Sequence, residues 1–288
     1  VTVAFTGTTL DTLTLASGGL LSGSDANART IGATTNANTR GRITSSLASG
    51  ELFIHSGSSS GLTIHSDITG TITPVFTSGG TNAGATIVLN NANTYVGTAY
   101  VNGVILVLGV NGSTTTTNAI TGDLIITGGN INGTGSGAVA NSRVALSANN
   151  QIADASNVTV RGGSQLDLDG FNDSIASLTF QGQGGYADGG SLVQTAAGRL
   201  TLTGNITSAN LDDIRLIPTI SGNIALGASP TITVGKVSGT TLLGARGDLN
   251  EQGGLVINAN ITGGATITKA GLGALQLGGT STSITTIN

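Results

Sequence analysis

A short pattern recurs along the whole chain: an apolar residue, any residue and a second apolar residue, then a turn rich in glycine or asparagine, then a further apolar residue. Leu52-Phe-Ile-His-Ser-Gly57, Leu62-Thr-Ile-His-Ser-Asp-Ile68 and Leu200-Thr-Leu-Thr-Gly-Asn-Ile206 are examples. Such a unit buries only one or two side chains, so it cannot fold alone and must be covered by copies of itself. The pattern therefore predicts stacked coils that form a rod.

The composition favours short strands over helices. Of the 288 residues, 38% are hydrophobic and 8% are charged, and there are 47 glycines, 3 prolines and no methionine. Lys, Glu and Met, which suit helix interiors, are scarce, whereas Thr, Val and Ile, which suit strands, fill the segments between glycines. No window approaches the roughly 18 apolar residues of a membrane-spanning helix. We predict an all-β chain with a core of thin aliphatic layers and no membrane insertion.

Charge and cysteine content narrow the range of partners. The net charge is −4, the pI is about 4.9, and the 10 basic residues are scattered along the chain. Duplex nucleic acid and anionic membranes are therefore not expected partners. The chain has no cysteine, so it has neither disulfides nor a thiolate metal site. We expect no cofactor and no metal ion.

Two topologies fit the alternation: an up-and-down antiparallel meander and a parallel β-helix. Hairpins need strands of matched length, whereas the spacing here is irregular and the motif regular, which a β-helix tolerates by placing loops at its corners. We therefore predict one parallel β-helix domain over residues 1–288. Coils of about 20–25 residues, stacked about 4.8 Å apart, would give about 12 to 14 rungs and a rod of about 60 Å. The polar segments 22–42 and 111–118 are expected to be corner loops.

The ends of the chain also follow a β pattern. The first residue is Val1, no methionine is present, and residues 284–288 still alternate. We expect the chain to be a processed product or a piece of a longer protein.

Three segments share a longer pattern. Thr268-Lys-Ala-Gly-Leu-Gly-Ala-Leu-Gln-Leu-Gly-Gly279 has the form T-K-x-G-x-G-x-L-x-L-x-G, and Asn91 to Gly103 contains N-x-Y-x-G followed by a valine and a glycine. Together they resemble the autotransporter-associated β-strand repeat, and residues 150–178 are similar to the coil that joins such repeats in bacterial passenger domains. Near the end, Thr280-Ser-Thr-Ser-Ile284 replaces the N-x-Y-x-G half. The resemblance implies a right-handed parallel β-helix, exported and displayed or released at the bacterial surface as an adhesin or structural stalk.

Asp167 and Asp169 are the strongest candidate for chemistry. If both lie on one strand, they share a face about 6.5–7 Å apart, a separation that could serve two carboxylates in polysaccharide cleavage. Arg161 is the only basic neighbour in sequence, and outward acids on a solvated strand are ordinary surface. We therefore predict that the chain is not an enzyme, and we keep a polysaccharide lyase or glycosidase as the alternative.

Two further polar groups invite a binding interpretation. Asp212 and Asp213, followed by Arg215, could hold Ca²⁺ or a sugar if they lie on a loop, although a solvated corner is the simpler interpretation. His55 and His65 occupy the same place in two successive motif copies. If these copies stack, the imidazoles form a polar pair on one face, with or without a metal ion.

Repeated asparagines suggest ladders along the stack. Asn205, Asn223 and Asn260 each precede an isoleucine, and their side-chain amides could hydrogen-bond from rung to rung. The alternative is that asparagine simply favours the turn conformation.

Arg246, Gly247 and Asp248 form a tripeptide that integrins read through its paired charges, so they are a candidate adhesion motif. Short motifs arise by chance in glycine-rich chains, and the same residues can form an ordinary surface ion pair.

These observations favour an extracellular structural or adhesive β-helix of the bacterial cell surface, such as a stalk, a fibre or a coat. Its partners would be ligands on host or neighbouring cells, or further copies of itself joined laterally or head to tail. Uncapped terminal coils can add further coils without limit, because such contacts are heterologous and do not close. Open ends are also what a truncated chain would show.

Overall fold

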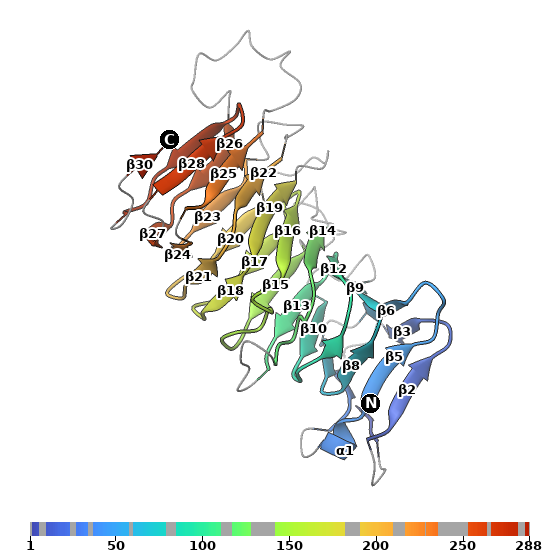
Figure 1. Ribbon diagram of the computed structural model, residues 1–288. Helices are drawn as coiled ribbons and strands as arrows, with labels where there is room; N and C mark the ends of the chain where they lie inside the picture. Colours follow the sequence, from blue (N-terminus) through green and yellow to red (C-terminus); the bar gives the residue numbers. More distant parts are fainter. Residues whose placement is uncertain are drawn as a thin grey trace.

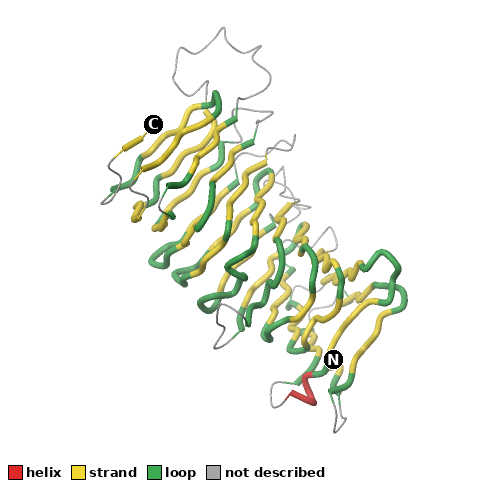
Figure 2. Tube along the Cα trace, in the orientation of Figure 1, coloured by secondary structure: helices red, strands yellow, loops and turns green. Residues whose placement is uncertain are grey.

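The computed structural model is an elongated solenoid of stacked parallel strands, with the N-terminus at one end and the C-terminus at the other (Figure 1). The structure describes residues 2–5, 10–23, 27–33, 37–57, 60–78, 85–110, 117–127, 142–181, 191–209, 217–227, 229–235, 253–263, 266–281 and 286–287. Strands stack side by side, and turns gather where the chain changes direction (Figure 2). This confirms the predicted all-β parallel solenoid.

Three faces run along the solenoid, and the chain visits them in turn. Face 1 and face 3 are 11-stranded sheets that begin with β1 and β3, respectively, whereas face 2 holds two separate 4-stranded sheets. The pairings in all four sheets are parallel, which excludes the antiparallel meander. Between its two sheets, face 2 is reduced to an isolated parallel bridge between Ile120 and Ile152.

The strand bounds follow this order of faces. Face 1 contains β1 (Thr2–Val3), β4 (Arg29–Ile31), β7 (Leu62–Ile64), β10 (Thr86–Leu89), β13 (Ile105–Leu108), β15 (Arg143–Leu146), β17 (Gln165–Asp167), β20 (Leu192–Gln194), β23 (Thr219–Ser221), β26 (Gly253–Ile257) and β29 (Ala274–Leu277). Face 2 contains β2 (Thr12–Leu15), β5 (Arg42–Ser45), β8 (Asp67–Gly70) and β11 (Thr94–Tyr95), then β18 (Asp173–Ile175), β21 (Leu200–Leu202), β24 (Asn223–Leu226) and β27 (Asn260–Gly263). Face 3 contains β3 (Gly19–Ser22), β6 (Glu51–Ser56), β9 (Thr73–Ser78), β12 (Ala99–Asn102), β14 (Leu124–Thr127), β16 (Asn157–Arg161), β19 (Ser177–Gln181), β22 (Ile206–Ser208), β25 (Thr231–Val234), β28 (Thr266–Ala270) and β30 (Thr286–Ile287).

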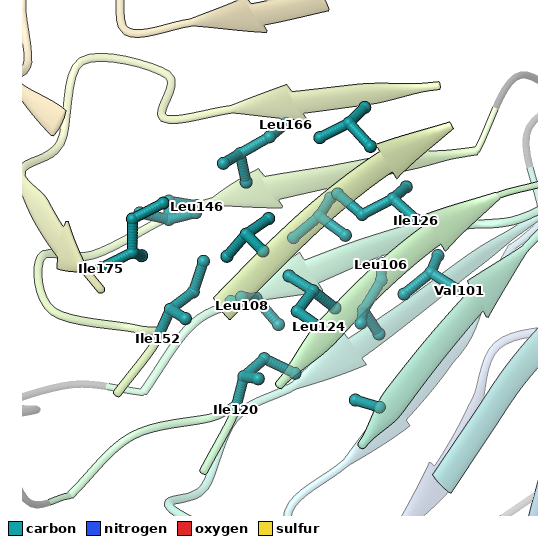
Figure 3. Close-up of a cluster of buried hydrophobic side chains, with 14 of the residues drawn as sticks. Val101, Leu106, Leu108, Ile120, Leu124, Ile126, Leu146, Ile152, Leu166 and Ile175 are labelled. Atoms are coloured by element: carbon teal, nitrogen blue, oxygen red, sulfur yellow. The ribbon is translucent and has the colours of Figure 1, made fainter. Parts of the chain in front are cut away.

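The core is a continuous aliphatic column inside the three faces. Because side chains alternate along a strand and the register is parallel, equivalent inward positions stack directly on one another. On face 1 one such stack consists of Leu62, Ile87, Leu106, Val144 and Leu166, all buried. Figure 3 shows inward side chains from all three faces meeting in the middle coils. A single coil would leave these side chains in water, so the stack is the smallest stable unit.

The coils are fewer and longer than the sequence predicts. Ile87 pairs with Leu62, 25 residues earlier, but Val144 pairs with Leu106, 38 residues earlier. Insertions at the corners therefore lengthen some coils, and each long sheet has 11 strands among the described residues, fewer than the about 12 to 14 rungs that coils of about 20–25 residues predict. At about 4.8 Å per step the stack rises about 48 Å rather than about 60 Å.

The corner-loop predictions are only partly right. Segment 22–42 contains strand β4 and the four-residue helix α1 (Ala37–Arg40) as well as turns. Sequence reasoning missed β4 because Ile31 is its only well-buried side chain, which leaves no visible alternation. Of segment 111–118, only the last two residues are described, and they lie outside any strand. No helix among the described residues is long and apolar enough to cross a bilayer.

Candidate functional site

Asp167 and Asp169 do not form an outward pair on a strand. Asp167 ends β17 and is only 2% exposed, because Arg143 from the preceding coil and Gln194 from the following coil both donate to its Oδ2 atom. Asp169 lies beyond the strand in a turn, with φ of 48°, and its N–H donates to Asp167 Oδ1 at 2.9 Å. The predicted geometry for two catalytic carboxylates is therefore wrong, and Asp167 stabilises the coil as a buried acceptor.

The two histidines do not stack. His55 lies on β6 in face 3, where its Nδ1 is 2.8 Å from Oγ1 of Thr77 in the next coil. His65 follows β7 in face 1, and its backbone N–H donates to Ile31. Burial, and secondly the positive charge of Arg40, lowers the pKa of His65. The prediction failed because the motif recurs once per face rather than once per coil, so successive copies lie on different faces.

Several predicted site residues fall outside the described part of the chain. These are the tripeptide of Arg246, Gly247 and Asp248, and the acidic group of Asp212 and Asp213 with Arg215. Among the residues that are described, no three His, Cys, Asp or Glu side chains come close enough together to hold a metal ion.

An asparagine ladder exists, but with different membership. Asn223 and Asn260 are register partners on face 2, and Asn260 Nδ2 donates to Asn223 Oδ1 at 3.2 Å. Thr280 in the following coil donates to Asn260 Oδ1 at 2.5 Å and so extends the ladder. Asn205 lies at a different corner, where its Oδ1 accepts a hydrogen bond from the N–H of Thr231 at 2.9 Å. The predicted ladder is thus confirmed for Asn223 and Asn260, whereas Asn205 hydrogen-bonds to the backbone of the next coil and lies outside the ladder.

A column of buried polar side chains connects the coils of face 2 by hydrogen bonds where its strands are interrupted. This column was not predicted from the sequence. It consists of Asn93, Asn118, Gln151 and Asp173. Asn93 accepts from the N–H of Ile68 at 2.9 Å and donates to the carbonyl of Ala119 at 2.7 Å. Gln151 both accepts from and donates to the backbone of Val110, at 2.8 and 3.1 Å. These side chains replace ladder hydrogen bonds that the missing strands would make.

Asp173 ends this polar column and carries the most perturbed carboxylate with a described environment. Its Oδ2 accepts from the N–H groups of Gln151 and Ile152, at 2.8 and 3.2 Å, and its Oδ1 accepts from Ser174 at 2.8 Å. The pKa of Asp173 is raised to about 7, chiefly by burial and to a smaller extent by the negative charge of Asp154, against the lowering effect of these three hydrogen bonds. Because three backbone N–H groups donate to its two oxygens, this carboxylate serves to hold the coils together.

The outward surface of face 3 differs in kind from these internal networks. One outward position is in register through eight successive coils, from β6 to β25. The first four coils carry an apolar file, namely Phe53, Val75, Tyr100 and Ile125. The next four carry a threonine file, namely Thr159, Thr179, Thr207 and Thr233. The chemistry of one continuous surface therefore changes abruptly in the middle of the solenoid.

A sequence signal for the apolar file was present. Phe53 and Ile125 each lie between two inward apolar residues, which makes an uninterrupted apolar triplet, whereas Thr159 lies between Val158 and Val160. Apolar residues at outward positions are the informative exception in such a pattern. This file is the candidate functional surface.

Comparison with protein-family models, with curated proteins and with solved structures gave no match. The parallel pairing of the strands defines the chain as a parallel β-rich solenoid. The surfaces described above are the basis for its function.

Proposed function

We propose that this chain is a non-enzymatic structural or adhesive β-helix of the bacterial cell surface, a segment of an autotransporter-like passenger. The observation that carries the proposal is the contrast between the buried polar side chains and the outer surface. The buried amides and acids described above are hydrogen-bonded from coil to coil, whereas one outward position of face 3 carries an uncharged residue in eight successive coils. A surface of this kind suits spacing and contact rather than bond cleavage.

The motif behind the family resemblance supports this proposal because its residues define coil geometry. Asn93 bridges three coils through its side chain, and Tyr95 is buried at 1% exposure. Gly97 has φ of 155°, and a Cβ on Gly122 in the next coil would lie 2.1 Å from the Gly97 carbonyl oxygen. A side chain at either glycine would separate the coils at this corner. The residues of the repeat therefore hold adjacent coils together, which is what a stalk or fibre requires.

Partners in this proposal are ligands on host or neighbouring cells, or further copies of the chain. Self-association remains part of it because the contacts between parallel coils are alike from one coil to the next, so coils of another copy can stack in the same way. Unpaired strand edges accept additional strands.

Three assays test the proposal, two with purified chain and one with cells that display it. Electron microscopy should show narrow rods, single or joined end to end, and cells that display the chain should adhere to a surface or to one another more than cells without it. Incubation with acidic and neutral polysaccharides should yield no shortened products. Polysaccharide cleavage that disappears in an Asp167→Asn, Asp169→Asn double variant would overturn the proposal in favour of a glycan-degrading enzyme.

A further inference from the structure

The apolar file on face 3 is accessible and has a defined direction. Phe53 is 41% exposed, and Val75, Tyr100 and Ile125 are each partly exposed although they lie within a sheet. Their side chains succeed one another at the coil spacing of about 4.8 Å, so the file runs parallel to the long axis of the solenoid. The two aromatic rings are two coils apart, which places them about 9.6 Å from one another.

A polar file accompanies the apolar one, two residues later on the same strands. His55, Thr77 and Asn102 are in register, and His55 Nδ1 lies 2.8 Å from Thr77 Oγ1. On the opposite side, Glu51 and Thr73 are in register. The surface is thus an apolar track about one side chain wide, with hydrogen-bonding groups along its edges.

The dimensions of this track disfavour a protein partner. Four residues at about 4.8 Å spacing give a strip about 14 Å long and one side chain wide. The area of such a strip is far below the roughly 1,200–2,000 Å² that a stable protein interface buries. A second copy of this chain would need much more contact than the track offers. The occupant must instead be narrow enough to gain most of its contact from one file of side chains.

The charge of the track disfavours a nucleic acid or an acidic polymer. Strands β6, β9, β12 and β14, which carry the apolar file, contain no Lys or Arg. Anionic chains bind through clustered cations, which this surface does not supply. The ligand that fits is linear, neutral and amphipathic, with apolar faces and polar edges.

We propose that the apolar file and its polar neighbours bind a neutral, extended, β-linked polysaccharide chain lying along the solenoid axis. The C–H faces of alternate sugar rings pack on Phe53 and Tyr100, whose separation is of the order of the repeat of an extended disaccharide. Hydroxyl groups at the ring edges exchange hydrogen bonds with Thr77 and Asn102. Aromatic side chains supply a large apolar area with little conformational cost, and the few polar groups fix orientation. This inference rests on the proposed adhesive function and names its ligand class.

The threonine file provides an internal comparison. It occupies the same outward position on the same face, so its backbone geometry is equivalent, but it offers small side chains in place of rings. Binding that depends on the rings must be confined to the first half of the solenoid.

The experiment measures binding of cellohexaose and chitohexaose to the whole chain by isothermal titration calorimetry, with the flexible polymer dextran as a comparison. We expect binding of at least one hexasaccharide and none of dextran, and a loss of affinity of about tenfold or more in a Phe53→Thr, Tyr100→Thr double variant. The matched Thr179→Ala variant should bind as the parent chain does. Thr is already found at this position in four other coils, so the double variant is compatible with the fold, and circular dichroism will verify that it is folded.

Three results would overturn the inference. One is no binding of either hexasaccharide while displayed chain still promotes adhesion, which leaves the proposed function standing without this ligand. Another is equal binding by the double variant and the parent chain. The third is a concentration-dependent dimer in sedimentation that the double variant abolishes, which would make a second copy the occupant of the track.

Discussion

Replacement of Asp173 by asparagine should remove a large part of the pH dependence of stability. The carboxylate belongs to the first residue of β18, where the second sheet of face 2 begins, and its two oxygens accept three backbone N–H groups. An asparagine oxygen in the Oδ2 position can still accept from Gln151 and Ile152, so the variant keeps the acceptor on which this corner depends. Only the contact with Ser174 is lost, at a cost of about 1 kcal/mol.

The sign and size of the change in the free energy of unfolding with pH follow from the raised pKa of Asp173. Burial raises it from 3.8 to about 7, so between these pH values the folded chain binds more protons than the unfolded chain. The free energy of unfolding therefore decreases as the pH rises through this window and is constant above it with respect to this group. The full difference between pH 3 and pH 8 is about 4 kcal/mol. Mild acid should thus stabilise the wild-type solenoid at this corner.

The assay is urea unfolding of the wild type and Asp173→Asn at a series of pH values between 4 and 8. Subtracting the two curves cancels the titration of all other groups, and hydrogen exchange at the Ile152 amide reports the same corner locally. The matched variant Asp154→Asn removes a neighbouring charge that raises the pKa, so its stability should decline over a narrower pH window than that of the wild type. Parallel pH curves for wild type and Asp173→Asn would refute the reasoning.

Three other substitutions test the packing of the coils by urea unfolding. Gly122→Ala places a methyl group 2.1 Å from a backbone carbonyl of the adjacent coil and should cost about 1–3 kcal/mol, whereas Gly19→Ala, with nothing within 4 Å, should be close to neutral. Phe180→Ala empties a fully buried site and should cost about 3–5 kcal/mol; a cost below about 1 kcal/mol would contradict the stacked core. Arg143→Leu deprives the buried Asp167 of its cation and should cost about 1–3 kcal/mol, less than for a fully buried pair because the arginine side chain is 34% exposed. An unchanged stability would show that Gln194 and the backbone suffice to hold this carboxylate.

The sequence predicts the alternation, the parallel stacking and the absence of long helices because these depend on local composition. Leu52 and Ile54, for example, are inward on the strand where the pattern places them. The pairing of coils is a different matter, because it depends on the length of each corner insertion. His55 and His65 share a motif but lie on different faces, and no local property of either histidine distinguishes the faces.

The burial of Asp167 also could not be predicted from the sequence, because it depends on how the coils pair. Side chains alternate along β17, so Asp167, which follows the inward Leu166, is expected to point outward, and an outward acid is normally solvated. Arg143 and Gln194 cover it because coil lengths bring them into register above and below, 24 and 27 residues away. Arg161, the basic residue that lies near Asp167 in the sequence, donates instead to the side chain of Gln181. Contacts across coils therefore need the register before they can be assigned.

Within each coil, inward positions determine the packing and outward positions determine the surface, so a solenoid of this kind can change its surface chemistry without changing its fold. Phe53 and Thr159 occupy equivalent outward positions in the same file, and the strands that carry them keep the same inward alternation and the same pairing. Inward positions and corner amides are constrained by packing and by backbone hydrogen bonds, because an error there leaves a cavity or an unpaired polar group. Outward positions that are open to solvent carry no such constraint, so the surface chemistry of one file can differ from coil to coil. The ligand proposed above would then be recognised by a file of side chains that runs across coils, and a short motif within one coil would carry little information about it.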